Sequence, residues 1–257
     1  MAKAIDTLEH PAERPHGSRV DALRALHWLA LGWRDFAANP GPAAAQGAIL
    51  AALGWLILMF CSTQINLLAA AISVFLLVAP VLGAGFYELS RRRERGQAAS
   101  FDAALEGATA RRWPLARLGA VLGIVAIAWV LTSNAMFAGS FMTAPPPPGE
   151  TFYRTIVDWA GSGFLMTYMV TGALFALVAF VLSATSAPML FDRDIGVRQA
   201  IGASVRTVAA HPLPMLVWAT VIAILAAVGF ATLLIGLIVI LPWLGHATWH
   251  AYRELTR

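Results

Sequence analysis

Four long stretches of the chain contain no Asp, Glu, Lys or Arg, and they organise the whole sequence. They lie between Asp35 and Glu88, Arg117 and Glu150, Asp158 and Asp192, and Arg206 and Arg253. An α-helix rises about 1.5 Å per residue, so about 20 apolar residues cross a hydrocarbon core about 30 Å thick. The pattern therefore predicts membrane-spanning helices rather than the core of a soluble domain.

These stretches predict six spans. The polar run at 62–66 divides the first stretch, and the second and third stretches hold one span each. The fourth has no polar break between Leu213 and Leu241 and is too long for one crossing, so we expect two short spans with a turn near Gly229 to Gly236. The first four predicted spans are 44–61, 67–87, 118–140 and 164–187.

The arginines set the expected orientation. Cytoplasmic loops of membrane proteins are rich in Lys and Arg. If the last stretch crosses twice, 17 of the 18 basic residues, Arg91, Arg193 and Arg253 among them, lie on one side, and Arg154 alone lies outside. This predicts a multi-pass protein of the bacterial inner membrane with both termini in the cytoplasm.

One unit is used three times, over residues 18–95, 99–194 and 196–257, after a disordered or extended tail at 1–17. Each unit starts with a segment of mixed apolar and charged residues that ends in a proline, and a helical hairpin follows. Such segments are typical of amphipathic helices in the headgroup layer. We therefore expect an all-α membrane bundle of six transmembrane helices. They form three repeated hairpins, each preceded by a cytoplasmic interfacial amphipathic helix.

Composition supports this interpretation. Hydrophobic residues make up 59% of the chain, charged residues 12%, and the mean hydropathy is +0.69. Soluble domains carry about 25% charged residues, so an ordinary soluble enzyme, a disordered chain and a nucleic-acid-binding module are excluded. The net charge of +4 is explained by orientation in the membrane. A lone cysteine, Cys61, excludes a disulfide within the chain.

Candidate chemistry is sparse. His246 and His250, spaced i and i+4, share a helix face as two metal or haem ligands would. No Asp, Glu or Cys lies close in sequence, so histidines at the interface that bond backbone or phosphate are the favoured alternative. No Ser/His/Asp set, carboxylate pair or phosphate-binding loop can be assembled. We therefore predict no catalytic residue, no metal, no cofactor and no enzymatic activity.

Aromatic and glycine residues supply the remaining candidates. Trp28, Trp33, Trp113, Trp243 and Trp249 are expected in an inner aromatic belt. Candidate contacts with lipid or a partner are Trp28 and Trp33 on the inside and Arg154 and Trp159 on the outside, after four prolines at 145–148. Gly119 and Gly123 form a GxxxG pattern, which predicts close helix packing within the chain or pairing of two copies.

Several motifs carry a family resemblance: LGWRDFAANPGP at 31–42, Pro-x-Leu-Gly from Pro80, SAPMLFDRD ending at Asp194, and LPWLGHATWHAYREL at 241–255. With these motifs the chain resembles a family of predicted bacterial integral membrane proteins of unknown function. Some members of that family have been described as cytochrome c oxidase proteins. The resemblance implies a membrane bundle and assigns no residue a role.

Three functions remain open. The leading hypothesis is a non-catalytic accessory or assembly subunit of a larger membrane complex, such as a respiratory one. Its partners would be the bilayer and a membrane protein, with homo-oligomers allowed and nucleic acid excluded. The repeats and proline-broken helices suggest a transporter or lipid-handling protein as an alternative. A haem or metal protein that uses His246 and His250 is the second alternative.

Overall fold

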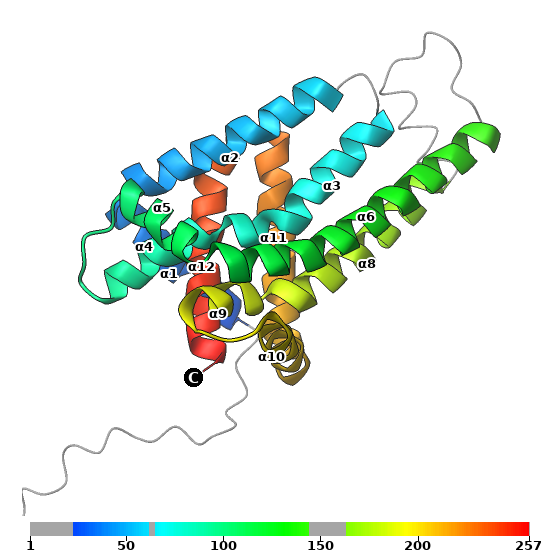
Figure 1. Ribbon diagram of the computed structural model, residues 1–257. Helices are drawn as coiled ribbons and strands as arrows, with labels where there is room; N and C mark the ends of the chain where they lie inside the picture. The colour runs from blue at the N-terminus through cyan, green and yellow to red at the C-terminus, as the bar shows by residue number, and fades with distance from the viewer. Residues whose placement is uncertain (1–22, 62–64, 144–162, 257) are drawn as a thin grey trace, which may run out of the picture.

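The computed structural model describes residues 23–61, 65–143 and 163–256, and over these ranges the chain is helical without a β-strand (Figure 1). The helices are α1 Arg24–Ala38, α2 Pro40–Cys61, α3 Ile65–Leu82, α4 Ala84–Glu94, α5 Phe101–Ala110, α6 Arg112–Thr143, α8 Phe164–Ser183, α9 Ser186–Asp192, α10 Val197–Ala210, α11 Pro212–Ala231 and α12 Leu237–Leu255. The all-α class is therefore confirmed.

A shorter helix followed by two long helical segments occurs three times along the chain. The short helices α1, α5 and α10 form where the leading segments of the repeats were expected. Their closing prolines begin the next helix: Pro40 and Pro212 are the first residues of α2 and α11, and Pro114 is the third residue of α6. Proline fits the first helical turn because the N–H groups there have no partner within the helix.

Five helical segments in the described part of the chain are long and apolar enough to cross a membrane. They are Pro40–Cys61, Ala70–Glu94, Arg112–Gly139, Phe164–Asp192 and Pro212–Ala231. α12, the expected sixth span, is not among them, because charged and histidine side chains occupy its second half. The break between α11 and α12 falls at 232–236, inside the predicted turn, where Leu233 and Leu234 adopt positive φ angles of 52° and 68°.

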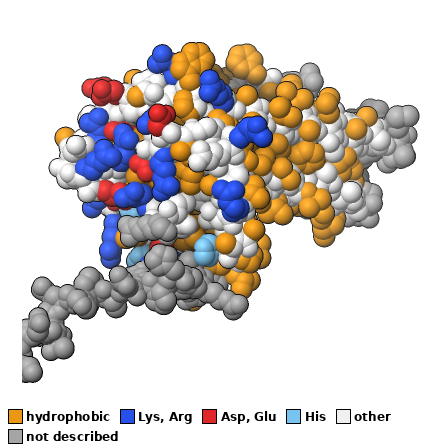
Figure 2. Space-filling model, turned by 60° about the horizontal axis from the view of Figure 1, so that its bottom comes forward, with side chains coloured by type: hydrophobic (Ala, Val, Ile, Leu, Met, Phe, Trp, Pro, Cys, Tyr) orange, Lys and Arg blue, Asp and Glu red, His pale blue; other side chains and the backbone are white. Residues whose placement is uncertain are grey.

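The surface separates into two parts. Figure 2 shows arginine and acidic side chains gathered at one end of the molecule and apolar side chains over the rest of this face. On the apolar part, only 6% of the α8 span and 17% of the α2 span are buried. Outward-facing residues such as Phe60 and Met166 are more than two-thirds exposed. Apolar area of this extent is stable against lipid tails but not against water.

We call the end that carries these charges the charged end, and helices distant in sequence meet there. α1 packs along α12, with Gly32 against the backbone of Ala247. At the start of α1, Glu254 accepts hydrogen bonds from Arg24 Nε at 2.6 Å and Trp28 Nε1 at 3.0 Å. The first and last helices of the chain are thus joined by both close packing and charge.

We predict that Gly32→Ala destabilises the protein. A Cβ atom at Gly32 would lie 2.6 Å from the backbone nitrogen of Ala247, so α1 and α12 would have to separate. Overpacking of this kind costs about 1–3 kcal/mol. Thermal unfolding in detergent measures the loss. Gly41→Ala is the matched control, because a Cβ there meets nothing within 4 Å; equal melting temperatures for the two variants would contradict the predicted close contact.

Candidate functional site

The buried carboxylate of Asp35 lies at the centre of a polar cluster formed by α1, α4 and α12. Its Oδ2 atom lies 2.6 Å from Ser90 Oγ and 2.9 Å from His250 Nε2, and its Oδ1 atom lies 2.9 Å from Arg93 Nε. Ser90 Oγ is also 2.8 Å from His246 Nδ1. These five residues, Asp35, Ser90, Arg93, His246 and His250, are called the Asp35 network below.

The donors in this network follow from the chemistry of its members. An ionised carboxylate only accepts hydrogen bonds, so His250 and Ser90 donate to Asp35. Arg93 forms an ion pair with the same carboxylate. The single proton of Ser90 is then committed, and His246 must donate to Ser90 through its Nδ1–H. In a neutral imidazole this leaves Nε2 as an acceptor. His246 Nε2 is buried and makes no hydrogen bond among the described residues.

The pKa of Asp35 lies below its ordinary value of 3.8. Burial alone would raise it, since desolvation disfavours the carboxylate. The hydrogen bonds from His250 and Ser90 outweigh that effect. Asp35 is therefore ionised at neutral pH, and its charge is held inside the protein by two hydrogen bonds and the ion pair with Arg93.

Further ion pairs surround the Asp35 network and join α4, α9 and α12. Buried Glu88 pairs with Arg91 at 2.5 Å and Arg92 at 2.7 Å within α4. Glu94 accepts from Trp249 Nε1 at 3.0 Å and lies 3.3 Å from Arg253 Nε. Carboxylates at the charged end are thus paired with donors from other elements as well as from their own helix.

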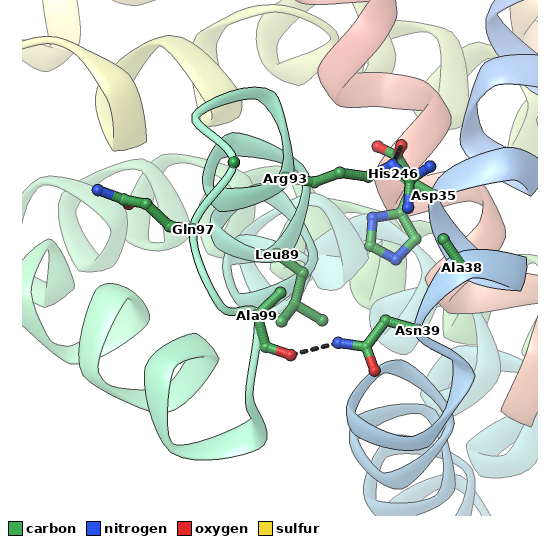
Figure 3. A pocket seen from close by; sticks show the side chains of 9 residues that line it. Asp35, Ala38, Asn39, Leu89, Arg93, Gln97, Ala99 and His246 are labelled. Atoms are coloured by element: carbon green, nitrogen blue, oxygen red, sulfur yellow. Dashed lines mark hydrogen bonds and ion pairs between the residues drawn. The ribbon is translucent and has the colours of Figure 1, made fainter.

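A cavity of about 330 Å³ opens beside the network (Figure 3). Its wall includes Asp35 and Arg93, and the His246 ring projects towards Leu89 and Asn39 in the close-up view. The side chain of Gln97 points away from this group. The full lining is Asp35, Ala38, Asn39, Leu89, Arg93, Gly96, Gln97, Ala99 and His246. On its α1 side, the Asn39 amide donates to the carbonyl of Ala99.

The network corrects the expectation that no Ser/His/Asp set would form. Asp35, Ser90 and His246 come from three distant segments, but their order differs from that of a catalytic triad. In a triad the histidine lies between the serine and the carboxylate and takes the serine proton. Here Ser90 lies in the middle, is 1% exposed and donates its proton to Asp35. This geometry fixes the three helices and does not activate Ser90 as a nucleophile.

The two histidines bond to groups inside the protein, which differs from the expected contact with headgroup phosphate, whereas a backbone hydrogen bond between His246 and Phe86 agrees with the expectation. His246 is 2% exposed and bonds Ser90, with the ring of Phe86 against it, while His250 bonds Asp35. The described residues contain no group of three or more His, Cys, Asp or Glu that could hold a metal ion. The His246–His250 pair thus takes part in hydrogen bonds to two different partners rather than in one ligand set.

The structure contradicts the predicted positions of some tryptophans and leaves others as candidates. Trp28 is fully buried against Trp218 and Glu254, so the prediction that it contacts lipid or a partner is wrong. Trp249 is also fully buried, and its place in the aromatic belt is wrong. Trp33 is 44% exposed and remains a candidate contact. Arg154 and Trp159 lie outside the described residues.

The GxxxG residues do not form a close helix contact within the chain. A Cβ at Gly119 would meet only Val81, at 3.9 Å, and one at Gly123 would meet nothing within 4 Å. The close contacts occur instead at glycines that were not singled out, such as Gly47 against the Ile238 carbonyl. Pairing of two copies through Gly119 and Gly123 stays a prediction.

Comparison with known proteins gives one match. The model of the family described as "Predicted integral membrane protein (DUF2189)" matches residues 67–192, which include α4 and therefore Ser90 and Arg93. This confirms the resemblance to a membrane family of unknown function. No curated protein and no solved structure matches the chain.

We predict that Asp35→Asn lowers the free energy of unfolding by about 3 kcal/mol, because Arg93 and His250 lose their buried counter-charge. Asp194→Asn is the matched control: the Asp194 side chain is 98% exposed and pairs only with Arg111 at 3.4 Å. Chemical or thermal unfolding in detergent measures both. Equal stabilities for Asp35→Asn and wild type would contradict the proposed dependence on this carboxylate.

The difference in stability between wild type and Asp35→Asn should also depend on pH. The folded-state pKa of Asp35 is depressed, so its contribution is complete above the unfolded value of 3.8 and is lost as the pH falls through the folded value. The stability difference between wild type and Asp35→Asn should therefore shrink as the pH falls below about 4. A difference that grows as the pH falls below about 4 would have the wrong sign.

Proposed function

From the match of residues 67–192 to the family described as "Predicted integral membrane protein (DUF2189)", we propose that the chain is a non-catalytic accessory or assembly subunit of a larger membrane complex. In this proposal it crosses the inner membrane six times, with both termini in the cytoplasm. Partner recognition occurs between helices within the bilayer. The proposal rests on the surfaces and ion pairs described next.

Contacts between the ends of α4 and α12 at the charged end support six crossings. Glu94 at the end of α4 contacts Trp249 and Arg253 near the end of α12. Two chain points on one side of a membrane are separated by an even number of crossings. α6, α8 and α11 supply three, so α12 supplies the fourth. Its 19 residues extend about 28 Å, close to the hydrocarbon thickness.

Orientation is supported by the arginines. The described residues carry 13 arginines against 8 acidic side chains, a net charge of +5. On the charged end these residues mark the cytoplasmic side by the positive-inside rule. The outward faces of α1, α5 and α10 carry Leu26, Leu105 and Val205, each at least 40% exposed. We infer that these helices lie in the headgroup layer while their other faces pack on the bundle.

A long apolar stripe on α8 is the observation that carries the subunit proposal. Met166, Val170, Leu174 and Val178 recur every four residues and are all about half exposed or more, so they line one face of the helix. With only 6% of its span buried, α8 is the least enclosed of the five candidate spans. A helix of a partner subunit would give α8 the packing that this chain does not provide.

The alternative of a transporter finds little support in the described pockets. The apolar pocket lined by Gly54, Phe75 and Leu234, among others, has room for about 10 Å³. That is at or below the limit for one water molecule. A substrate route through this part of the bundle would therefore need a different conformation.

Cysteine labelling tests the six-span topology. In a Cys61→Ser background we expect Leu233→Cys, in the exposed turn between α11 and α12, to react with a membrane-impermeant maleimide from outside the cell. Arg95→Cys and Thr256→Cys should react only after lysis. Labelling of Leu233→Cys and Thr256→Cys from the same side would show that α12 does not cross.

Photo-crosslinking tests the subunit proposal. A photoreactive amino acid at Leu174 on α8 should crosslink to one membrane protein in near-stoichiometric yield, and native gels of mild detergent extracts should show the same assembly. Ile224 on α11 is the matched control, since its exposure of 58% is close to the 59% of Leu174. A protein that runs alone, with only lipid adducts at both positions, would contradict the proposal.

A further inference from the structure

An unused acceptor faces the cavity beside the Asp35 network. His246 is 2% exposed, lines the cavity, and holds Nε2 without a hydrogen-bond partner among the described residues. The tautomer fixed by Ser90 makes this nitrogen a hydrogen-bond acceptor. A buried polar atom without a partner is costly. The nitrogen itself has almost no accessible surface, so a hydroxyl group of a molecule in the cavity reaches it when the imidazole ring turns towards the cavity, and the hydrogen bond then removes that cost.

A cation lies on the same wall. Arg93 uses Nε to bind Asp35, and its terminal nitrogens make no hydrogen bond or ion pair within the described ranges. The Arg93 side chain is 45% exposed, so a ligand can reach it. Asp35 neutralises part of the Arg93 charge, which disfavours a bare anion at this place. The net charge of +5 over the described residues still favours a ligand of negative charge.

Size limits the ligand further. A volume of about 330 Å³ is at the small end of ligand sites and about ten times the share of one water in the liquid. We propose that this cavity binds a small polyol phosphate, with a hydroxyl group donating to His246 Nε2 and the phosphate paired with Arg93. Arginine suits a phosphate because its planar guanidinium offers paired donors.

The ligand could be soluble or belong to a lipid. Asn39 on the cavity wall directly precedes Pro40, where the first candidate span begins. The cavity therefore lies close to the level of the cytoplasmic headgroups. Glycerol 3-phosphate and the headgroup of phosphatidylglycerol share the required chemistry, a hydroxyl group and a phosphate, and the experiment below separates them. The inference does not depend on the proposed role as an accessory subunit.

Two substitutions at His246 separate the acceptor from the scaffold. In His246→Asn the side-chain amide nitrogen can occupy the Nδ1 position and keep the bond to Ser90, while the Nε2 acceptor is lost. In His246→Gln the amide oxygen can reach the Nε2 position and restore an acceptor. Loss of binding in the first variant and partial recovery in the second would identify the acceptor as the contact.

A second pair of variants tests the cavity without touching the network. Ala38 lines the cavity and is exposed, so Ala38→Trp should fill the space from the rim. Ala37 is also an exposed residue of α1 but does not line the cavity, and Ala37→Trp is the matched control. Equal melting temperatures for these two proteins would show that both fold.

The measurement is calorimetric binding of glycerol 3-phosphate to the full chain in detergent, with inorganic phosphate and glycerol as separate probes. We expect saturable binding of glycerol 3-phosphate that is about tenfold weaker in His246→Asn, absent in Ala38→Trp and unchanged in Ala37→Trp. Inorganic phosphate and glycerol should each bind more weakly than glycerol 3-phosphate. In the lipid arm, native mass spectrometry from nanodiscs that contain phosphatidylglycerol and phosphatidylethanolamine should retain phosphatidylglycerol on wild type and lose it in Ala38→Trp.

Binding of glycerol 3-phosphate alone identifies a soluble ligand, and retention of phosphatidylglycerol alone identifies the lipid. The proposal is overturned if neither probe binds saturably, or if Ala38→Trp and Ala37→Trp bind equally. It is also overturned if inorganic phosphate binds as tightly as glycerol 3-phosphate, because the hydroxyl contact to His246 would then contribute nothing.

Discussion

The charged end depends on one buried negative charge. Asp35 on α1 takes hydrogen bonds from Ser90 on α4 and His250 on α12 and forms an ion pair with Arg93, so that it joins three helices distant in sequence. A carboxylate removed from water is stable only when several donors replace the lost hydration. Ser90 and His250 provide hydrogen bonds and Arg93 provides an ion pair, from two helices that must both lie beside α1. Burying the Asp35 carboxylate is therefore favourable only when α1, α4 and α12 are packed so that these groups reach it.

This constraint explains why the first and last helices of the chain are adjacent. Within lipid the hydrophobic effect cannot distinguish one helix pair from another, because lipid tails are as apolar as leucine side chains. Close contacts such as Gly32 against Ala247 allow α1 and α12 to approach, but they do not by themselves select this pair. Selection comes from polar groups that have a single complementary partner, and these lie at the charged end. The apolar part then needs only to match the bilayer.

The sequence was sufficient for features that depend on local or one-dimensional rules. Charge-free stretches located the first four spans, Pro40 and Pro212 marked helix starts, and the turn at 232–236 fell inside its expected range. The Asp35 network could not be foreseen, since its members lie on three segments separated by up to 215 residues. One available signal was missed: Asp35 lies within the motif LGWRDFAANPGP, and an acidic residue on the otherwise apolar face of a short helix calls for a partner. The prediction for Trp28 was wrong because an aromatic residue beside charged residues is compatible both with an interface and with a buried hydrogen bond. In the structure Trp28 forms the buried hydrogen bond, to Glu254.

The two parts of the molecule also differ in what they leave unsatisfied. At the charged end many charged side chains form ion pairs within the chain, and the unpaired Nε2 of His246 and the terminal nitrogens of Arg93 lie together on one cavity wall. On the apolar part the situation is reversed, since only 6% of the α8 span is buried and its outward face contacts no other part of the described chain. An unmet hydrogen bond selects for a specific ligand, whereas an uncovered apolar helix accepts lipid as readily as protein. Specific recognition of a small molecule is therefore best sought at the cavity beside Asp35, and recognition of a membrane partner requires polar or small residues in addition to the stripe on α8.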